Sequence, residues 1–190
     1  MKTFTHLPMK NTIHYLALVF IAVSLWSCSK SGDSNVTPKT TYTFTVNGNS
    51  YTESSSADSS ATDVSSSTAF HIVAVSGASA DGKAQAFIEL IFLGSAKPAA
   101  GSYKVVGDVT SMTTSEVAIL AADNVTAAKS GLYGSTGKDN VSLTISVNSS
   151  GKLSATMPSI VTSGSNFDNT DPKNTVITAV TGNVSGKFSE

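Results

Sequence analysis

The hydrophobic pattern changes along the chain, and its first part is one continuous apolar run. Ile13–Trp26 is almost uninterrupted by polar residues and follows Lys2 and Lys10. From Tyr42 onward, apolar residues instead alternate with polar ones, which is the period of a half-buried β-strand. The pattern therefore predicts an apolar leader, a polar connecting stretch and a β-rich remainder.

The alternating part predicts a series of short strands separated by turns. Asn47-Gly48 is the clearest hairpin signal, because Asn-Gly favours the type I′ turn between two strands. Val117–Ala122 also fits a buried helical turn, and we favour a strand there. Asp81-Gly82 and residues 148–151 are predicted turns. The predicted strands are 42–46, a segment resuming at Tyr51, 70–75, 85–93, 103–106, 116–122, 141–147, 153–157, 176–180 and a last short one ending at Phe188.

Two polar stretches and one doubly apolar strand complete this pattern. Residues 54–68 are rich in Ser, Thr, Ala and Asp and are predicted to form a long loop or a weak edge. Residues 163–174 are predicted to form a polar loop, and Pro158 to end or edge the strand before it. Gln85–Leu93 carries apolar residues on both faces, apart from Glu89. Such a strand is typical of the interior of a layered domain.

The number and spacing of these elements indicate the fold class. About nine or ten short strands, with no long amphipathic helix, predict one all-β domain over residues 41–190. An antiparallel two-layer β-sandwich is the favoured architecture. A small β-barrel is the alternative.

The apolar leader has the order of a secretory signal, with a charged start, an apolar middle and a small residue at its end. Its run of about 14 residues is shorter than the roughly 20 that a membrane-spanning helix needs. Leu25-Trp26-Ser27-Cys28 also resembles a bacterial lipobox. That resemblance implies cleavage before Cys28, which then carries a diacylglycerol and an amide-linked acyl chain. Residues 1–27 are thus expected to be a lipoprotein signal peptide, and 28–40 a lipid-anchored flexible tether.

Three further segments resemble a domain-of-unknown-function family found in Bacteroidota-type cell-envelope lipoproteins. Phe44–Tyr51 is similar to its Phe-x-hydrophobic-Asn-Gly-x-x-aromatic opening, and Pro98–Tyr103 to its Pro-x-x-Gly-x-Tyr step. The closing strands of that family are similar to 153–156, 176–178 and 186–188. The resemblance spans 42–188 and implies a β-sandwich in the envelope with no catalytic residue to carry over.

Composition narrows the possible chemistry. The chain has no arginine, and after removal of 1–27 it keeps ten lysines against thirteen acidic residues, which disfavours nucleic-acid binding. His71 is then the remaining histidine and lies in an apolar strand pattern, so we expect a strand histidine. With Cys28 lipidated, neither a zinc site nor a nucleophile–histidine pair is expected, and no cofactor is predicted.

Two loops offer the residues best suited to contact a ligand. Tyr133 lies among glycines, and Phe167 precedes Asp168 and Asp171 in a polar segment, so we expect these four residues at any ligand contact. Oxygen-rich Asn166–Asp171 also suits calcium, but a solvated loop is favoured and no metal site is predicted.

The expected function is a non-catalytic binding or structural module, lipid-anchored in the bacterial cell envelope at the outer membrane. Its expected partners are the membrane, through the lipid, and a glycan or an envelope protein. A glycan-binding surface lipoprotein is one alternative, and a carboxylate hydrolase is a less favoured one.

Overall fold

The computed structural model describes residues 42–63, 66–125, 128–171 and 174–190, which contain ten β-strands and no helix. The predicted leader 1–27, the lipidation site Cys28 and the tether 28–40 lie outside the described residues. No helix long and apolar enough to cross a membrane occurs in the described ranges. The strands are β1 (Thr43–Val46), β2 (Asn49–Asp63), β3 (Thr68–Ala78), β4 (Gln85–Leu93), β5 (Gly101–Val106), β6 (Glu116–Asp123), β7 (Lys129–Ser135), β8 (Ser142–Val147), β9 (Leu153–Asp168) and β10 (Val176–Ser189).

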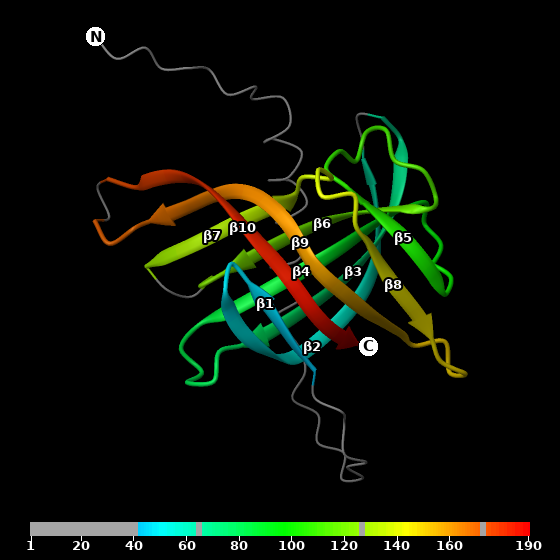
Figure 1. The fold of residues 1–190 in the computed structure, drawn as a ribbon, viewed down its shortest axis with the longest axis horizontal. Helices are drawn as coiled ribbons and strands as arrows, with labels where there is room; N and C mark the ends of the chain where they lie inside the picture. The colour runs from blue at the N-terminus through cyan, green and yellow to red at the C-terminus, as the bar shows by residue number, and fades with distance from the viewer. Residues whose placement is uncertain (1–41, 64–65, 126–127, 172–173) are drawn as a thin grey trace. The chain divides into compact units, whose positions relative to one another are not determined.

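All ten strands belong to one mixed sheet, in the order β10-β1-β2-β3-β4-β6-β5-β8-β9-β7. Because β9 also pairs with β10, the pairings return on themselves, and Figure 1 shows β9 and β10 crossing in front of β4. The pairing of β5 with β6 is parallel, whereas the other described pairings are antiparallel. The all-β prediction is therefore confirmed, but one mixed sheet replaces the wholly antiparallel two-layer arrangement expected from the sequence.

Two strands change partner along their length. The first residues of β6 pair with β5, and Leu120–Asp123 pair with β7. In the same way, β9 pairs first with β8 and then, through Thr162–Asp168, with β7. The ends of β5 and β7 therefore meet at a fork in the sheet between β6 and β9.

The core lies on the inner face of this curved sheet. Alternate residues of a strand point to opposite faces, so β4 contributes Ile88 and Leu90 to the core and turns Phe87 and Ile91 the other way. All four side chains are buried, which confirms that β4 is apolar and buried on both faces. The largest core side chains, fully buried, come from eight strands: Phe44, Tyr51, Ile88, Leu90, Ile119, Tyr133, Leu143, Ile145, Leu153 and Phe188.

The first hairpin forms as its sequence predicts. Asn47 and Gly48 have φ values of +50° and +83°, as a type I′ turn requires, and Val46 pairs with Asn49 across it. The predicted strands 85–93 and 116–122 are also confirmed as β4 and β6. Short-range turn chemistry and apolar content thus identified these elements correctly.

The long strand β2 corrects one prediction. Residues 54–63 form its second half, where the sequence indicated a loop or weak edge. Their backbone pairs with β3, although their Ser, Thr and Asp side chains do not predict a strand. The short strand β1 pairs only with residues 49–52 of β2, so the second half of β2 is paired with β3 alone. The prediction of an edge strand is therefore correct for this half, and the prediction of a loop is wrong.

The C-terminal strands are also longer than predicted. β9 continues through Pro158 because a bulge there removes the need for the backbone N–H that proline lacks. Residues 163–168, predicted as loop, extend β9 and pair with both β7 and β10. β10 runs through Gly182 as a single strand. β7, with the sequence Lys-Ser-Gly-Leu-Tyr-Gly-Ser, was not predicted.

The alternation in β8 is confirmed at its centre and fails at its end. Leu143 and Ile145 are fully buried, and Val141 packs against the core from just before the strand. Val147, expected to be buried with them, is 37% exposed because β8 ends there in the turn that Asn148 begins.

Truncating Ile145 to Ala is expected to lower the free energy of unfolding by about 2–5 kcal/mol, because it leaves a cavity in a packed core. Val147→Ala is the matched control, with an expected change within about 0.5 kcal/mol. Urea unfolding followed by intrinsic tyrosine fluorescence measures both. Equal effects of the two changes would contradict this account of the core.

Candidate functional site

A groove of about 610 Å³ opens at the fork between the ends of β5 and β7. The end of β5 forms one wall, and the turn that follows β7 forms another. Residues of β9 and β10 complete it from the far side of the fork. The residues that line it are Lys104, Val105, Val106, Gly107, Asp108, Ser111, Glu116, Ser135, Thr136, Gly137, Lys138, Val161, Ser163 and Thr181.

Backbone contacts that need small residues hold the walls of this groove together. The hydroxyl of Ser135 donates to the carbonyl of Val106 and accepts from the backbone N–H of Ile119 at 3.0 Å. Ser135 therefore joins β7 to β5 and β6 at the fork. A Cβ atom at Gly107 would lie 2.6 Å from the carbonyl oxygen of Thr136, so a larger residue would push the walls apart.

The groove presents hydroxyl groups and charges of both signs. Lys104 and Lys138 are its cations, and Asp108 and Glu116 are its carboxylates. Hydrogen bonds from the backbone N–H and the hydroxyl of Thr110 lower the pKa of Asp108, which keeps this carboxylate ionised at neutral pH. Among the described residues that line the groove, none is aromatic. Its chemistry therefore suits a polar ligand with several hydroxyl groups, held by hydrogen bonds rather than by ring stacking.

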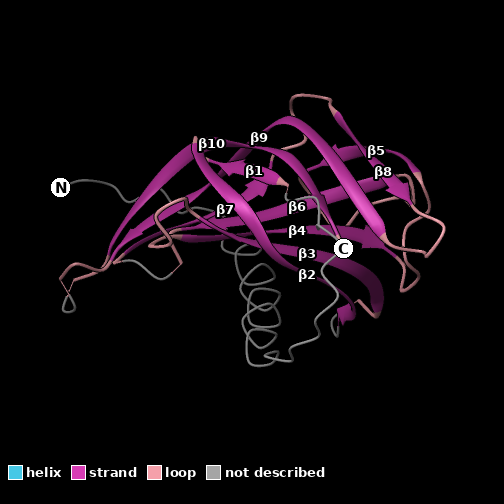
Figure 2. Cartoon of the chain, turned by 90° about the horizontal axis from the view of Figure 1, so that it is seen from below, coloured by secondary structure: helices cyan, strands magenta, loops and turns pink. Residues whose placement is uncertain are grey.

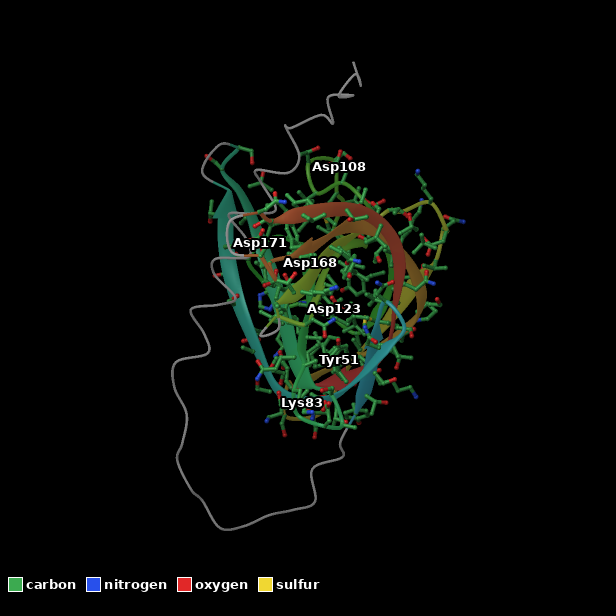
Figure 3. The ribbon with its side chains drawn as sticks, turned by 90° about the vertical axis from the view of Figure 1, so that its left-hand side faces the viewer. Tyr51, Lys83, Asp108, Asp123, Asp168 and Asp171 are labelled. Atoms are coloured by element: carbon green, nitrogen blue, oxygen red, sulfur yellow. The ribbon has the colours of Figure 1, made fainter. Side chains whose placement is uncertain are left out.

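A second polar cluster is buried inside one end of the sheet, around Tyr133. The hydroxyl of Tyr133 donates to Asn166 Oδ1 at 2.6 Å and lies 3.2 Å from Asp123 Oδ1. Asn49 Nδ2 donates to the other carboxylate oxygen of Asp123 at 3.3 Å. Figure 3 looks at this end of the sheet, with Tyr51 and Asp123 near its centre. These contacts connect β2, β6, β7 and β9 across the interior.

Burial controls the protonation of this cluster. It is the main reason that the pKa of Tyr133 rises to about 12, and the nearby charge of Asp123 acts in the same direction. Burial also raises the pKa of Asp123, while hydrogen bonds from Asn49 and Tyr133 act against that rise. Tyr133 is therefore a neutral hydrogen-bond donor at physiological pH, which is a structural role.

The structure places Tyr133 differently from the sequence analysis. It is 1% exposed and belongs to β7, so the expectation of an exposed loop position is wrong. Its glycine neighbours have a packing reason instead. A Cβ atom at Gly131 would lie 1.8 Å from the Tyr133 hydroxyl, so only glycine leaves room for the ring.

Phe167, Asp168 and Asp171 lie together near the tip of the β9–β10 hairpin. Phe167 is half-buried at the end of β9 and pairs with Ile177, which is 62% exposed. Asp168 forms an ion pair with Lys129 at 3.1 Å, and hydrogen bonds from Thr170 are the main reason that its pKa falls to about 2. Asp171 is exposed in the loop beyond. Ligand contact by these residues and Tyr133 stays a prediction.

A charged cluster lies at the free edge of β2. Lys97 Nζ is 3.1 Å from Asp58 Oδ2 and also contacts the carboxylate of Glu190 near the end of β10. His71 is buried in β3, as predicted, with Nδ1 3.3 Å from the carbonyl of Ser95. In the described ranges, no three or more His, Cys, Asp or Glu side chains are placed to hold a metal ion.

Comparison of the chain with protein-family models, curated proteins and solved structures gave no match. What the structure itself shows is an all-β protein with a groove at a strand fork and a buried polar cluster around Tyr133. The resemblance to a family of envelope lipoproteins stays a prediction.

Replacing Tyr133 with Phe is expected to lower the free energy of unfolding by about 1–3 kcal/mol, because buried acceptors on Asn166 and Asp123 lose their donor. Tyr42→Phe, at a half-buried position before β1, is the matched control with an expected change within about 0.5 kcal/mol. Urea unfolding at pH 7 measures both. A destabilisation no greater than that of the control would show that the cluster adds nothing to stability.

Proposed function

We propose that this protein is a lipid-anchored lipoprotein of the bacterial cell envelope whose β-domain is a non-catalytic binding module. The observation that carries the proposal is Leu25-Trp26-Ser27-Cys28 at the end of the apolar run, with Cys28 the one cysteine of the chain. A diacylglycerol with a further acyl chain anchors a protein stably, because each buried methylene contributes about 0.8 kcal/mol. The outer membrane is the proposed location.

The groove supports binding rather than catalysis. Ser135, its most buried hydroxyl, is engaged by the backbone of β5 and β6, and the described residues that line the groove include no histidine to act as a base. Nucleophilic catalysis by serine needs a base within hydrogen-bond reach. The remaining lining groups are hydrogen-bonding groups and opposed charges, which are suited to recognition.

A glycan is the ligand class that the groove favours. Hydroxyl groups of Ser111, Thr136 and Ser163 lie with Lys104 and Lys138 around one opening, and sugars present many hydroxyls that such groups bind. The tip formed by Phe167, Asp168 and Asp171 is the alternative contact, since it offers an aromatic ring for stacking beside acceptors. The two sites belong to different parts of the sheet and are separable by mutation.

The lipid anchor predicts a mature protein that begins at Cys28 and carries acyl chains. Intact-mass and N-terminal peptide mass spectrometry of protein purified from bacterial membranes measures this directly. Cys28→Ala is expected to leave an uncleaved precursor or to move the protein into the soluble fraction. Ser27→Ala is the control, because it keeps a small residue at the cleavage site and is expected to be processed normally. An unmodified Cys28 in the purified protein would overturn the anchor.

Glycan binding predicts that a glycan array probed with the soluble domain gives hits that weaken with Lys104→Ala. Lys152→Ala, at an exposed lysine before β9, is the matched control and is expected to leave binding unchanged. Loss of binding with Phe167→Ala instead would assign the contact to the β9–β10 tip. Absence of any glycan hit would leave a protein partner or a structural role as the function of the module.

A further inference from the structure

The groove at the strand fork is continuous with the outer face of β7, β9 and β10. Alternate residues of a strand point to opposite faces of the sheet, and Ile160 and Thr162 of β9 are buried on its inner face. Val161 and Ser163, which line the groove, therefore belong to the outer face. The same alternation puts Phe167 on the outer face, near the far end of β9. The groove thus opens onto a sheet surface that continues beyond it.

Strand pairing arranges the outer residues of these three strands in rows. In Figure 1 and again in Figure 2, β7 and the ends of β9 and β10 that lie beside it run toward the left, away from β5 and β8. Ser163 and Thr181 line the groove as well, so the rows begin at its border. We call the three rows the outer track; from the groove outward they are Gly134, Ser163 and Thr181, then Leu132, Ser165 and Ala179, then Ser130, Phe167 and Ile177.

The outer track is accessible to a ligand. Ser163, Ala179 and Thr181 are exposed, and the other residues of the first two rows are half-buried. In the last row, Ile177 is 62% exposed, which makes it the most exposed large apolar side chain among the described residues. Phe167 lies beside it and is half-buried. A ligand that leaves the groove along the track therefore meets an accessible aromatic ring.

The chemistry of the outer track differs from that of the groove. None of its nine residues is charged, and most are glycine, alanine, serine or threonine. The nearby charges of Asp168 and Lys129 alternate to the other face of the sheet, where Lys129 Nζ lies 3.1 Å from Asp168 Oδ2. Hydroxyl groups and an aromatic ring suit sugars, which present hydroxyls at their edges and an apolar face to a ring. The track therefore suits the uncharged part of a glycan.

The outer track is held rigidly by its strands. The middle strand β9 pairs with β7 on one side and with β10 on the other along the whole track. β7 and β9 approach so closely that a Cβ atom at Gly164 would lie 1.9 Å from the carbonyl oxygen of Leu132. A surface that is already ordered loses little conformational freedom when a ligand binds. The track is thus a preformed surface.

We propose that the groove and the outer track form one elongated site for a linear oligosaccharide, with one end in the groove and a sugar ring stacked on Phe167. The inference rests on the proposed function, because it takes the groove as a glycan site and adds the shape and length of the glycan. From Ser163 to Phe167, at about 3.4 Å per residue of β9, the track is roughly 14 Å long. That length exceeds one sugar ring, so a chain of several rings is needed to contact both ends.

The length of the oligosaccharide tests this site in the full-chain protein. Protein in phospholipid nanodiscs is titrated by calorimetry with cello-, manno-, xylo- and chito-oligosaccharides, each as the disaccharide and the hexasaccharide. In the series that binds, the hexasaccharide is expected to bind about tenfold more tightly, because it reaches the ring as well as the groove. Equal affinities would overturn the elongated site and leave the groove as a glycan site. Absence of binding in all four series and on the glycan array would overturn glycan binding itself, and this inference with it.

Variants of Phe167 test the contact with the ring. Phe167→Leu keeps an apolar side chain but removes the ring, so it is expected to weaken hexasaccharide binding about tenfold. Its disaccharide binding is expected to stay unchanged, which also shows that the variant is folded. Phe167→Tyr keeps the ring and is expected to bind the hexasaccharide normally, as is Tyr42→Leu, a matched control at a half-buried aromatic residue before β1. Full retention of the length dependence in Phe167→Leu would contradict the proposal.

Two neighbouring residues of β10 test which face of the strand the glycan follows. Ala179 and Thr178 are both exposed, but Ala179 belongs to the outer track and Thr178 points to the other face. Ala179→Lys places a long side chain across the track and is expected to remove the advantage of the hexasaccharide, whereas Thr178→Lys is expected to preserve it. Lys104→Ala, in the groove, is expected to weaken binding of both saccharides. Equal effects of the two β10 changes, or unchanged hexasaccharide binding in Lys104→Ala, would overturn a site that joins the groove to the track.

Discussion

The pairing of β9 with β10 is the constraint on which the rest of the sheet depends. It runs from Ser154–Ser189 at one end to Asp168–Val176 at the other, with one bulge between them. β10 also pairs with β1, so β10 connects β9 to the N-terminal hairpin. Without it the inner face of the sheet would stay open, and Val184 and Phe188 would lose the core that surrounds them. At the bulge, Gly186 has a φ of +132°, and a Cβ atom there would lie 2.5 Å from Phe44 Cα, so glycine allows the three strands to meet.

The elements that could be predicted are those whose signal is local. Asn47-Gly48 determines its own turn, and Gln85–Leu93 reads as a strand on apolar content alone. The second half of β2 is different, because its small polar residues are strand only through their pairing with β3. The prediction that Pro158 ends its strand was wrong for a similar reason. A bulge in the pairing of β9 with β10 lets β9 continue beyond Pro158, and the sequence alone does not show that bulge. Long-range pairing, rather than local propensity, decided these segments.

The candidate site was less predictable than the fold. The groove exists because β6 and β9 each exchange one neighbour for another, and no residue pattern marks that exchange. The glycines near Tyr133 do have a structural role. They leave room for its buried hydroxyl group and do not mark an exposed loop. A tyrosine flanked by glycines within two residues signals close approach of backbone, and that reading would have placed it inside. Which polar groups meet it from β2, β6 and β9 depends on strand order.

The two faces of β4 place opposite demands on its sequence. Ile88 and Leu90 are buried permanently by the core, so any polar substitution there would be costly at every pH. A face always covered by apolar side chains would favour an apolar residue at position 89 as well, because an unpaired carboxyl opposes burial. A face always open to water would instead not favour Phe87, Ile91 and Leu120 around that carboxyl. Glu89 is buried on that face, and burial raises its pKa to about 7, so uptake of a proton near neutral pH removes the cost of burying its charge.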